Sequence, residues 1–174
     1  LWDAQHLTYG APDLLVRSDI LPLLIPDAIT AEQATTPAPD LGTPFHYLVV
    51  DIKFSTLHLS ATGELTNSGS ATAYKSQLHI YNRALGNLQG HQPPDSFLLG
   101  RSWEQRVSGD TLRGSSCLDR LAPVPQAGSL ANKIPTAQAV EESTAWLRRA
   151  RTEGASWDIT PTPTVPQLYP NMGN

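Results

Sequence analysis

Two charged residues interrupt an apolar run in the first half of the chain. The run 47–54 reads YLVVDIKF, and its charged members are Asp51 and Lys53. Side chains alternate between the two faces of a strand, so a strand here places Asp51 and Lys53 on one face. The opposite face is expected to pack in the core and consists of Leu48, Val50, Ile52 and Phe54. A carboxylate near an ammonium group suits phosphodiester hydrolysis, since the carboxylate binds a hard cation and the lysine orients or deprotonates the attacking water. A plain ion pair near a sheet edge is the alternative interpretation.

A second polar pair follows in the run 73–86, AYKSQLHIYNRALG. Leu78, Tyr81 and Leu85 recur at helical spacing, which predicts a helix. We expect Gly86 to cap its C-terminus, and Ser70 or Thr72 to cap its start. Gln77 and Tyr81 are four residues apart and therefore share one face of this helix. Taken alone, such a pair also fits a core tyrosine beside an exposed glutamine.

The order of these elements adds information that neither pair carries alone. A strand with Asp51 and Lys53, followed by a helix with Gln77 and Tyr81, resembles the PD-(D/E)XK nuclease superfamily and, within it, the RecB-like branch. The resemblance covers about residues 9 to 103. It implies an α/β (α+β) fold with a restriction-endonuclease-like core, in which a mixed central sheet is flanked by helices and interrupted by loop insertions.

The resemblance also implies a site. Mg²⁺ or Mn²⁺ would be bound by an earlier aspartate, by Asp51 and by the carbonyl oxygen of Ile52, while Lys53 acts on the water. In the RecB-like branch, residues at the positions of Gln77 and Tyr81 line the site and contact the nucleic acid. The expected activity is metal-dependent hydrolysis of nucleic acid, with DNA expected in preference to RNA.

The earlier aspartate has several candidates, because the chain contains four Pro-Asp pairs. Asp13 precedes the run Leu14-Leu15-Val16-Arg17, which predicts a strand that has Asp13 and Arg17 on one face. Asp27 begins a segment that resembles a capped helix start. Asp40 lies in a loop rich in threonine and proline. We expect Asp13 to be the metal ligand, with Asp27 as the main alternative.

The net charge of −4 is unusual for a protein that binds nucleic acid, but the charges are unevenly distributed. Residues 1–100 hold 9 acidic and 4 basic residues, whereas residues 101–174 hold 7 acidic and 8 basic residues. Bound metal ions would offset part of the first excess. Arg17 and Arg101 are the basic residues that we expect to contact the substrate.

The length of 174 residues allows one well-buried domain and little more. We expect a nuclease-like core over 1–103, with insertions near 20–45 and 55–72, the latter containing a small hairpin around 61–64. The first helix of the superfamily core has no room before Asp13, so the chain is interpreted as part of a longer protein with further domains. A C-terminal extension over 104–155 should contain a helix near 136–153. Residues 156–174 read as a proline-rich tail or linker.

The chain shows no apolar run long enough to span a membrane and no signal peptide at its start. Its one cysteine, Cys117, rules out an internal disulfide framework, fits a reducing compartment and is interpreted as a small buried residue. These features predict an intracellular protein that is not secreted and does not bind a membrane.

Three hypotheses from different classes follow. The first is a nuclease that depends on Mg²⁺ or Mn²⁺. The second is a catalytically inactive module of the same fold that binds nucleic acid or acts as a scaffold. The third is an unrelated α/β interaction domain in which the motifs are accidental. Metal binding separates the first two hypotheses from the third, and cleavage separates the first from the second.

Overall fold

The computed structural model describes residues 1–114, 118–131, 133–158, 160 and 163–168; Cys117 lies outside them. These residues form two compact units, Leu1–Ala139 and Val140–Asn174. The strands are β1 (Trp2–Asp3), β2 (Thr8–Tyr9), β3 (Leu14–Arg17), β4 (Tyr47–Leu59), β5 (Asp95–Val107), β6 (Asp110–Gly114) and β7 (Ala122–Pro125). The helices are α1 (Leu21–Leu24), α2 (Ala31–Thr35), α3 (Ala71–Gln89) and α4 (Thr136–Glu153), with the short 3₁₀ helices η1 (Pro39–Leu41), η2 (Gly154–Ser156) and η3 (Pro166–Leu168).

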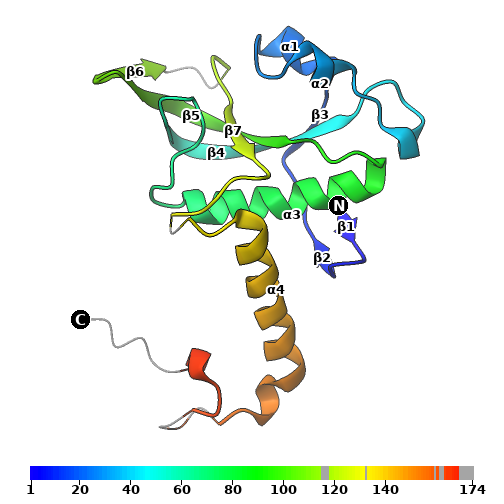
Figure 1. Ribbon diagram of the computed structural model, residues 1–174, viewed down its shortest axis with the longest axis vertical. Helices are drawn as coiled ribbons and strands as arrows, with labels where there is room; N and C mark the ends of the chain where they lie inside the picture. Colours follow the sequence, from blue (N-terminus) through cyan, green and yellow to red (C-terminus); the bar gives the residue numbers. More distant parts are fainter. Residues whose placement is uncertain (115–117, 132, 159, 161–162, 169–174) are drawn as a thin grey trace. The chain divides into compact units, whose positions relative to one another are not determined.

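The first unit is built on a five-stranded mixed sheet in the order β3-β4-β5-β6, with β7 also paired to β5 (Figure 1). β3 runs antiparallel to β4, and β4 runs parallel to β5. The parallel pair needs a crossover, which α3 supplies. The chain is therefore a mixed α+β protein with a mixed sheet flanked by helices, as the sequence predicts.

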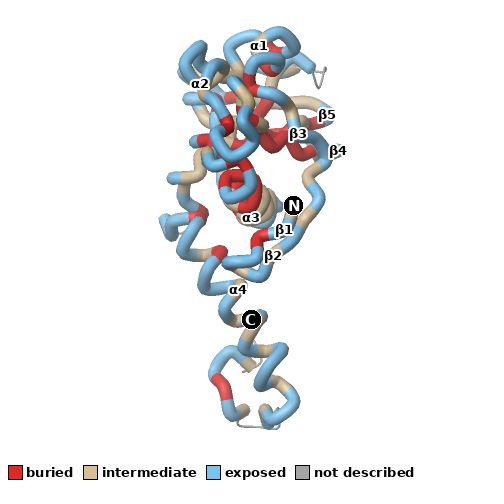
Figure 2. The backbone as a smooth tube through the Cα atoms, turned by 90° about the vertical axis from the view of Figure 1, so that its right-hand side faces the viewer, coloured by how far each residue is buried: buried red, intermediate tan, exposed pale blue. Residues whose placement is uncertain are grey.

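Each face of the sheet has its own core. On one face, Val49 and Leu98 pack against Leu78 and Leu85 of α3. On the other face, the segment of α1 packs against β4 and β5 in a cluster of Leu21, Ile25, Leu48, Val50 and Phe97. Figure 2 shows buried backbone along β4, β5 and α3. The insertion at 20–45 thus contributes Leu21 and Ile25 to the core, while Leu23 and Leu24 are exposed.

The predicted apolar face of β4 is only half covered. Leu48 and Val50 are buried, but Ile52 is 46% exposed and Phe54 is 86% exposed. The prediction that all four side chains pack in the core is therefore wrong for the last two. The α1 segment covers only the first part of this face of β4, because the core cluster that it forms with the sheet includes neither Ile52 nor Phe54. Instead, the Arg101 guanidinium lies 5.2 Å from the centre of the Phe54 ring.

The predicted helix around Gln77 exists and is longer than expected. It starts after Ser70 and ends at Gly90, whose φ of 71° is the left-handed conformation of a glycine C-cap. The prediction that Gly86 is the cap is wrong, because Gly86 lies inside α3. A side chain at Gly86 would meet Gln92, with the ideal Cβ 2.8 Å from the Gln92 Cβ. Gly86 therefore allows close packing and does not end the helix.

The predicted segment boundaries have mixed outcomes. β5 continues to Val107 and pairs with β6, so the expected boundary after residue 103 falls inside a strand. Strand pairing is non-local, which is why the composition of the chain did not show this continuation. The helix expected near 136–153 is α4, with the same bounds. The expected small hairpin is present, since Leu59 and Leu65 pair across the turn that contains Gly63.

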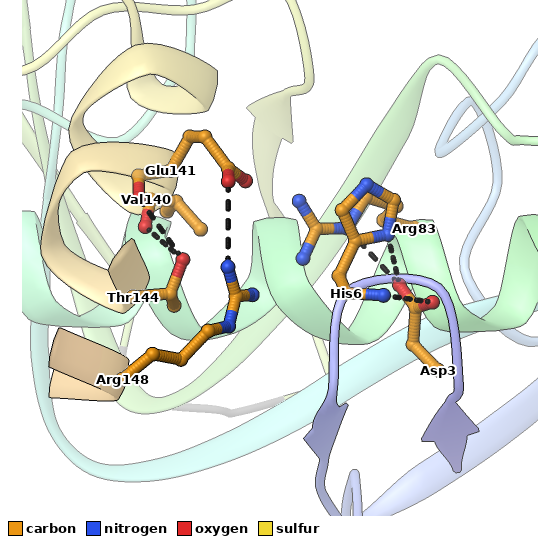
Figure 3. Close-up of polar contacts among 7 residues, drawn as sticks. All are labelled: Asp3, His6, Arg83, Val140, Glu141, Thr144 and Arg148. Carbon is orange, nitrogen blue, oxygen red and sulfur yellow. Dashed lines mark hydrogen bonds and ion pairs between the residues drawn. The ribbon is translucent and has the colours of Figure 1, made fainter. Parts of the chain in front are cut away.

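Within the second unit, α4 carries its own polar contacts. Figure 3 shows Thr144 beside Val140, whose carbonyl oxygen accepts a hydrogen bond of 2.8 Å from the Thr144 hydroxyl, and Arg148 directed toward Glu141 at 3.5 Å. The Trp146 and Trp157 rings are stacked with their centres 5.0 Å apart. Among the described residues, no helix is both long enough and apolar enough to cross a membrane.

Candidate active site

Asp51 and Lys53 point from β4 toward α3. Asp51 follows Val49 on the face that packs against the helix and is only 2% exposed. The Lys53 side chain is 19% exposed, and its ammonium group forms an ion pair with Asp51 Oδ2. Apart from this ion pair, Asp51 Oδ2 has no hydrogen-bond partner among the residues that the structure describes. The buried carboxylate therefore has capacity for a further positive ligand.

Asp13 approaches the same part of β4 from the neighbouring strand. Leu14 pairs with Val50, so the register places Asp13 opposite Asp51. The Asp13 Oδ2 atom accepts a hydrogen bond of 2.7 Å from the Ile52 backbone N–H. The N–H and C=O groups of one strand residue point to the same side, so the Ile52 carbonyl also opens toward Asp13. The Asp13 carboxylate thus lies at the backbone of Ile52, the residue next to Asp51.

The alternative aspartates lie elsewhere. Asp27 follows α1 with a φ of 62° and lines a cavity together with Trp103 and Arg120. The α1 segment covers the sheet face opposite the one to which Asp51 belongs. The interpretation of Asp27 as a helix cap is wrong, because Thr30 caps α2 in a capping box. Asp40 lies in η1 beside Gly90, at the C-terminal end of α3.

Gln77 and Tyr81 extend the polar network from β4 onto α3. The Lys53 ammonium donates a hydrogen bond of 3.0 Å to Gln77 Oε1. The Gln77 side-chain amide in turn donates one of 2.8 Å to the Tyr81 hydroxyl. The chain Asp51–Lys53–Gln77–Tyr81 is therefore continuous, and the four-residue spacing on α3 is what aligns its last two members.

A small N-terminal hairpin supports the Tyr81 end of this network. Gly10 lies directly on the Tyr81 ring, and an ideal Cβ at Gly10 would stand 2.0 Å from the ring atom Cε1. The hairpin is attached to α3 through buried Asp3, which bonds His6 Nδ1 at 2.8 Å and Arg83 Nε at 3.2 Å (Figure 3). Burial raises the pKa of Asp3, but the hydrogen bonds from His6 and the charges of His6 and Arg83 outweigh it, so the pKa is below its usual value.

Arg17 and Arg101, the two arginines expected to contact the substrate, do not join this network. Arg17 lies at the far end of β3, about 13 Å along the strand from Asp13 at 3.3 Å per residue. Its guanidinium bonds Asp19 at 2.7 Å and covers the Phe45 ring. Arg101 follows Gly100, the partner of Lys53, and so points to the opposite face, where it meets Phe54. Sequence alternation alone had not revealed these partners.

Tyr74 is a neighbour of Lys53 that the sequence analysis missed. The Lys53 ammonium lies 5.0 Å from the centre of its ring, within the range of a cation–π interaction. The signal was present in the spacing, because Tyr74, Gln77 and Tyr81 follow one another at three and four residues and so share one side of a helix.

The donor atoms of the site fit a magnesium ion better than a zinc ion. Within the described part of the chain, no group of three or more His, Cys, Asp or Glu side chains is placed to hold a metal. Mg²⁺ does not need such a group, because it usually binds one or two carboxylates and keeps several waters. Asp13, Asp51 and the Ile52 carbonyl are oxygen donors of this kind, and among the described residues Asp51 Oδ2 has no polar partner besides the Lys53 ammonium.

Comparisons of this chain with protein-family models, with curated proteins and with solved structures found no match. The geometry of the site is therefore the basis on which its function is inferred.

Proposed function

We propose that this protein is a divalent-metal-dependent nuclease with a restriction-endonuclease-like core of the RecB-like type. The observation that carries the proposal is the network in which the Lys53 ammonium contacts both Asp51 and Gln77 while Asp13 lies beside Ile52. A structural ion pair needs neither the second carboxylate nor the glutamine. A hydrolytic site needs all of them, since metal, water and substrate must be held together.

In the proposed mechanism, Asp13, Asp51 and the Ile52 carbonyl would hold Mg²⁺ or Mn²⁺. Such an ion would lower the pKa of a water molecule and offset charge on the phosphate. Lys53 orients the attacking water and stabilises the charge that develops on the phosphate oxygens. Gln77 fixes the Lys53 ammonium through their 3.0 Å hydrogen bond. Tyr81 in turn accepts a hydrogen bond from Gln77 and keeps its amide in place.

DNA as the preferred substrate, an intracellular location and further domains in a longer chain belong to the same proposal. Residues 1–100 carry more acidic than basic groups and by themselves would repel the phosphates of a nucleic acid. The uneven distribution of charge therefore supports a contribution to substrate binding from basic groups outside residues 1–100.

The test is cleavage of labelled single-stranded and double-stranded DNA and RNA with Mg²⁺, Mn²⁺ or EDTA. Asp51→Asn and Lys53→Met should each lower the rate by about a thousandfold or more, because groups that act as a unit are not additive. Asp19→Asn and Lys133→Met are matched controls with exposed side chains outside the network, and they should cleave like the wild type.

Activity that persists in EDTA, or that both site variants retain, would contradict the mechanism. Binding of nucleic acid without cleavage under any metal condition would favour an inactive binding module instead. A melting temperature that rises with Mg²⁺ in the wild type but not in Asp51→Asn would show independently that the carboxylate binds the metal.

A further inference from the structure

Two cavities adjoin one another, and the first of them lies next to the Lys53 end of the site. This first cavity has a volume of about 260 Å³ and lies between residues 55–58 of β4 and the segment that leads into α3. Tyr74 lines it, and the same ring lies 5.0 Å from the Lys53 ammonium. The second cavity, of about 490 Å³, extends to Arg106 on β5 and Arg113 on β6. His58 and Ser68 line both cavities, and the two together are here called the β4 groove.

The lining of the β4 groove is suited to phosphate groups. Near α3 it offers hydroxyl groups, including that of Ser70, which makes no cap hydrogen bond to its own helix. Farther along it offers the guanidinium groups of Arg106 and Arg113. Hydroxyl, backbone N–H and guanidinium groups are the usual partners of phosphate oxygens in nucleic-acid complexes.

The charge balance of the groove is positive. Glu104 lines its far part but is paired with Arg113 at 2.9 Å and lies 3.6 Å from His58. Arg106 has no ion pair within the part of the chain that the structure describes, so its charge is not offset by a neighbouring carboxylate. A polyanion that enters the groove therefore meets an uncompensated cation in a protein whose net charge is −4.

The aromatic end of the groove favours a single strand over a duplex. Its first part lies between residues 55–58 of β4 and residues 65–71, with Tyr74 in its lining. A single strand offers unpaired bases to such a ring, whereas a duplex keeps its bases paired and stacked. A basic groove with an aromatic side chain at one end is the arrangement that single-strand binding proteins use.

We propose that the β4 groove binds one single strand of nucleic acid on one side of the bond that the site would cut. The strand would leave Lys53 past Tyr74, run by Ser68 and His58, and end at Arg106 and Arg113. This inference rests on the proposed function for the position of the scissile phosphate. The groove itself is assigned from its own lining.

The test measures binding without cleavage. Short fluorescent single strands and matched duplexes are titrated in EDTA, with fluorescence anisotropy as the readout. The wild type should bind the single strand at least about tenfold more tightly than the duplex. The double variant Arg106→Gln/Arg113→Gln should weaken single-strand binding by about tenfold or more, because each lost charged hydrogen bond is worth about that factor.

The control Lys133→Gln/Arg149→Gln makes the same change in net charge at exposed side chains that do not line the groove, and it should bind within about twofold of the wild type. Ser68→Asp provides a second test that does not depend on the β5–β6 hairpin. The new carboxylate would repel phosphate, yet it stands just before α3, where a negative charge favours the helix. Ser143→Asp, exposed on α4, is its control.

The outcomes separate the two proposals. Three outcomes would each contradict single-strand binding by the β4 groove: equal affinity for duplex and single strand, no binding at all, or groove variants that bind like their controls. If the protein nevertheless cleaves nucleic acid, the nuclease proposal is kept and the groove proposal is dropped. Tight single-strand binding that the groove variants lose, in a protein that cleaves nothing, would retain the groove and overturn the nuclease.

Discussion

Lys53 lies at the centre of the contacts in the candidate site. Its ammonium contacts the Asp51 carboxylate, the Gln77 amide oxygen and, at 5.0 Å, the face of the Tyr74 ring. Each contact removes freedom from a side chain that otherwise rotates about several bonds, and burial of the stem removes more. A lysine held in this way can position a water molecule, which an exposed lysine on a mobile stem cannot do.

Gln77 should therefore matter for rate more than for stability. Gln77→Ala removes the hydrogen bond that orients Lys53, and we expect kcat to fall by about tenfold to a hundredfold while the fold persists. Tyr81→Phe keeps the ring packed on Gly10 but removes the acceptor of the Gln77 amide, so its effect should be smaller. Steady-state cleavage kinetics check both variants, with exposed Asn87→Ala as the control on the same helix. An unchanged kcat/KM in Gln77→Ala would show that Gln77 does not position Lys53.

At the scale of elements, α3 links the central sheet to the candidate site. It connects the two parallel strands, covers one sheet face and carries Tyr74, Gln77 and Tyr81. Its length exceeds the predicted one because Gly86 is a packing position. The helix continues to Gln89, whose side chain bonds the backbone N–H of Tyr47 at 2.9 Å and so ties the helix end to the start of β4.

This interpretation of Gly86 can be checked by substitution. Alanine has the higher helix propensity by about 1 kcal/mol, so an exposed Gly86 would make Gly86→Ala stabilising. The structure instead places the new Cβ 2.8 Å from Gln92 Cβ and 3.0 Å from Gln92 Cα. We expect the free energy of unfolding, measured with urea, to fall by about 1–3 kcal/mol. Gln92→Gly in the same chain should recover part of the loss, and a stabilised Gly86→Ala would contradict the packing role.

At the scale of the whole molecule, buried histidines link stability to pH. Burial lowers the pKa of His46, and it also lowers those of His79 and His91, with nearby positive groups adding to the effect. His46 is fully buried, bonds the Thr36 carbonyl through Nδ1 and lies against the His91 ring with 4.5 Å between ring centres. A proton on His46 would place a charge in a site without access to water, beside a second imidazole.

The sign of the pH effect follows from these pKa values. A histidine whose pKa is lowered by folding binds its proton in the unfolded chain first, so stability is complete above about pH 6.5 and falls as the pH decreases below it. Each such histidine contributes a slope of up to about 1.4 kcal/mol per pH unit. Urea unfolding between about pH 7 and about pH 5 measures the slope.

His46→Asn keeps a side-chain N–H for Thr36 and should reduce this slope. An identical slope in wild type and His46→Asn would show that His46 does not contribute to the acid sensitivity of the fold.

Local pattern was enough to predict much of this protein. Alternation predicted the strand with Asp51 and Lys53 on one face, and helical spacing predicted both α3 and α4 and the shared face of Gln77 and Tyr81. Both signals depend on residues that are close in the chain, where backbone geometry alone relates the side chains. The mixed α+β class was implied by the family resemblance that these elements carry.

The tertiary structure decided what depends on distant residues. Strand register placed Asp13, and not Asp27, beside Asp51, and no local pattern encodes which strands pair. The short reach of the α1 segment left Ile52 and Phe54 exposed on a face that alternation marked as core. The helix runs past Gly86 and ends at Gly90, while Gly86 allows close packing against Gln92, which lies beyond the helix. Arg17 pairs with Asp19, two residues along the chain, and covers the Phe45 ring, while Arg101 meets the Phe54 ring. The Phe45 contact joins residues far apart in the sequence and could not be read from local pattern.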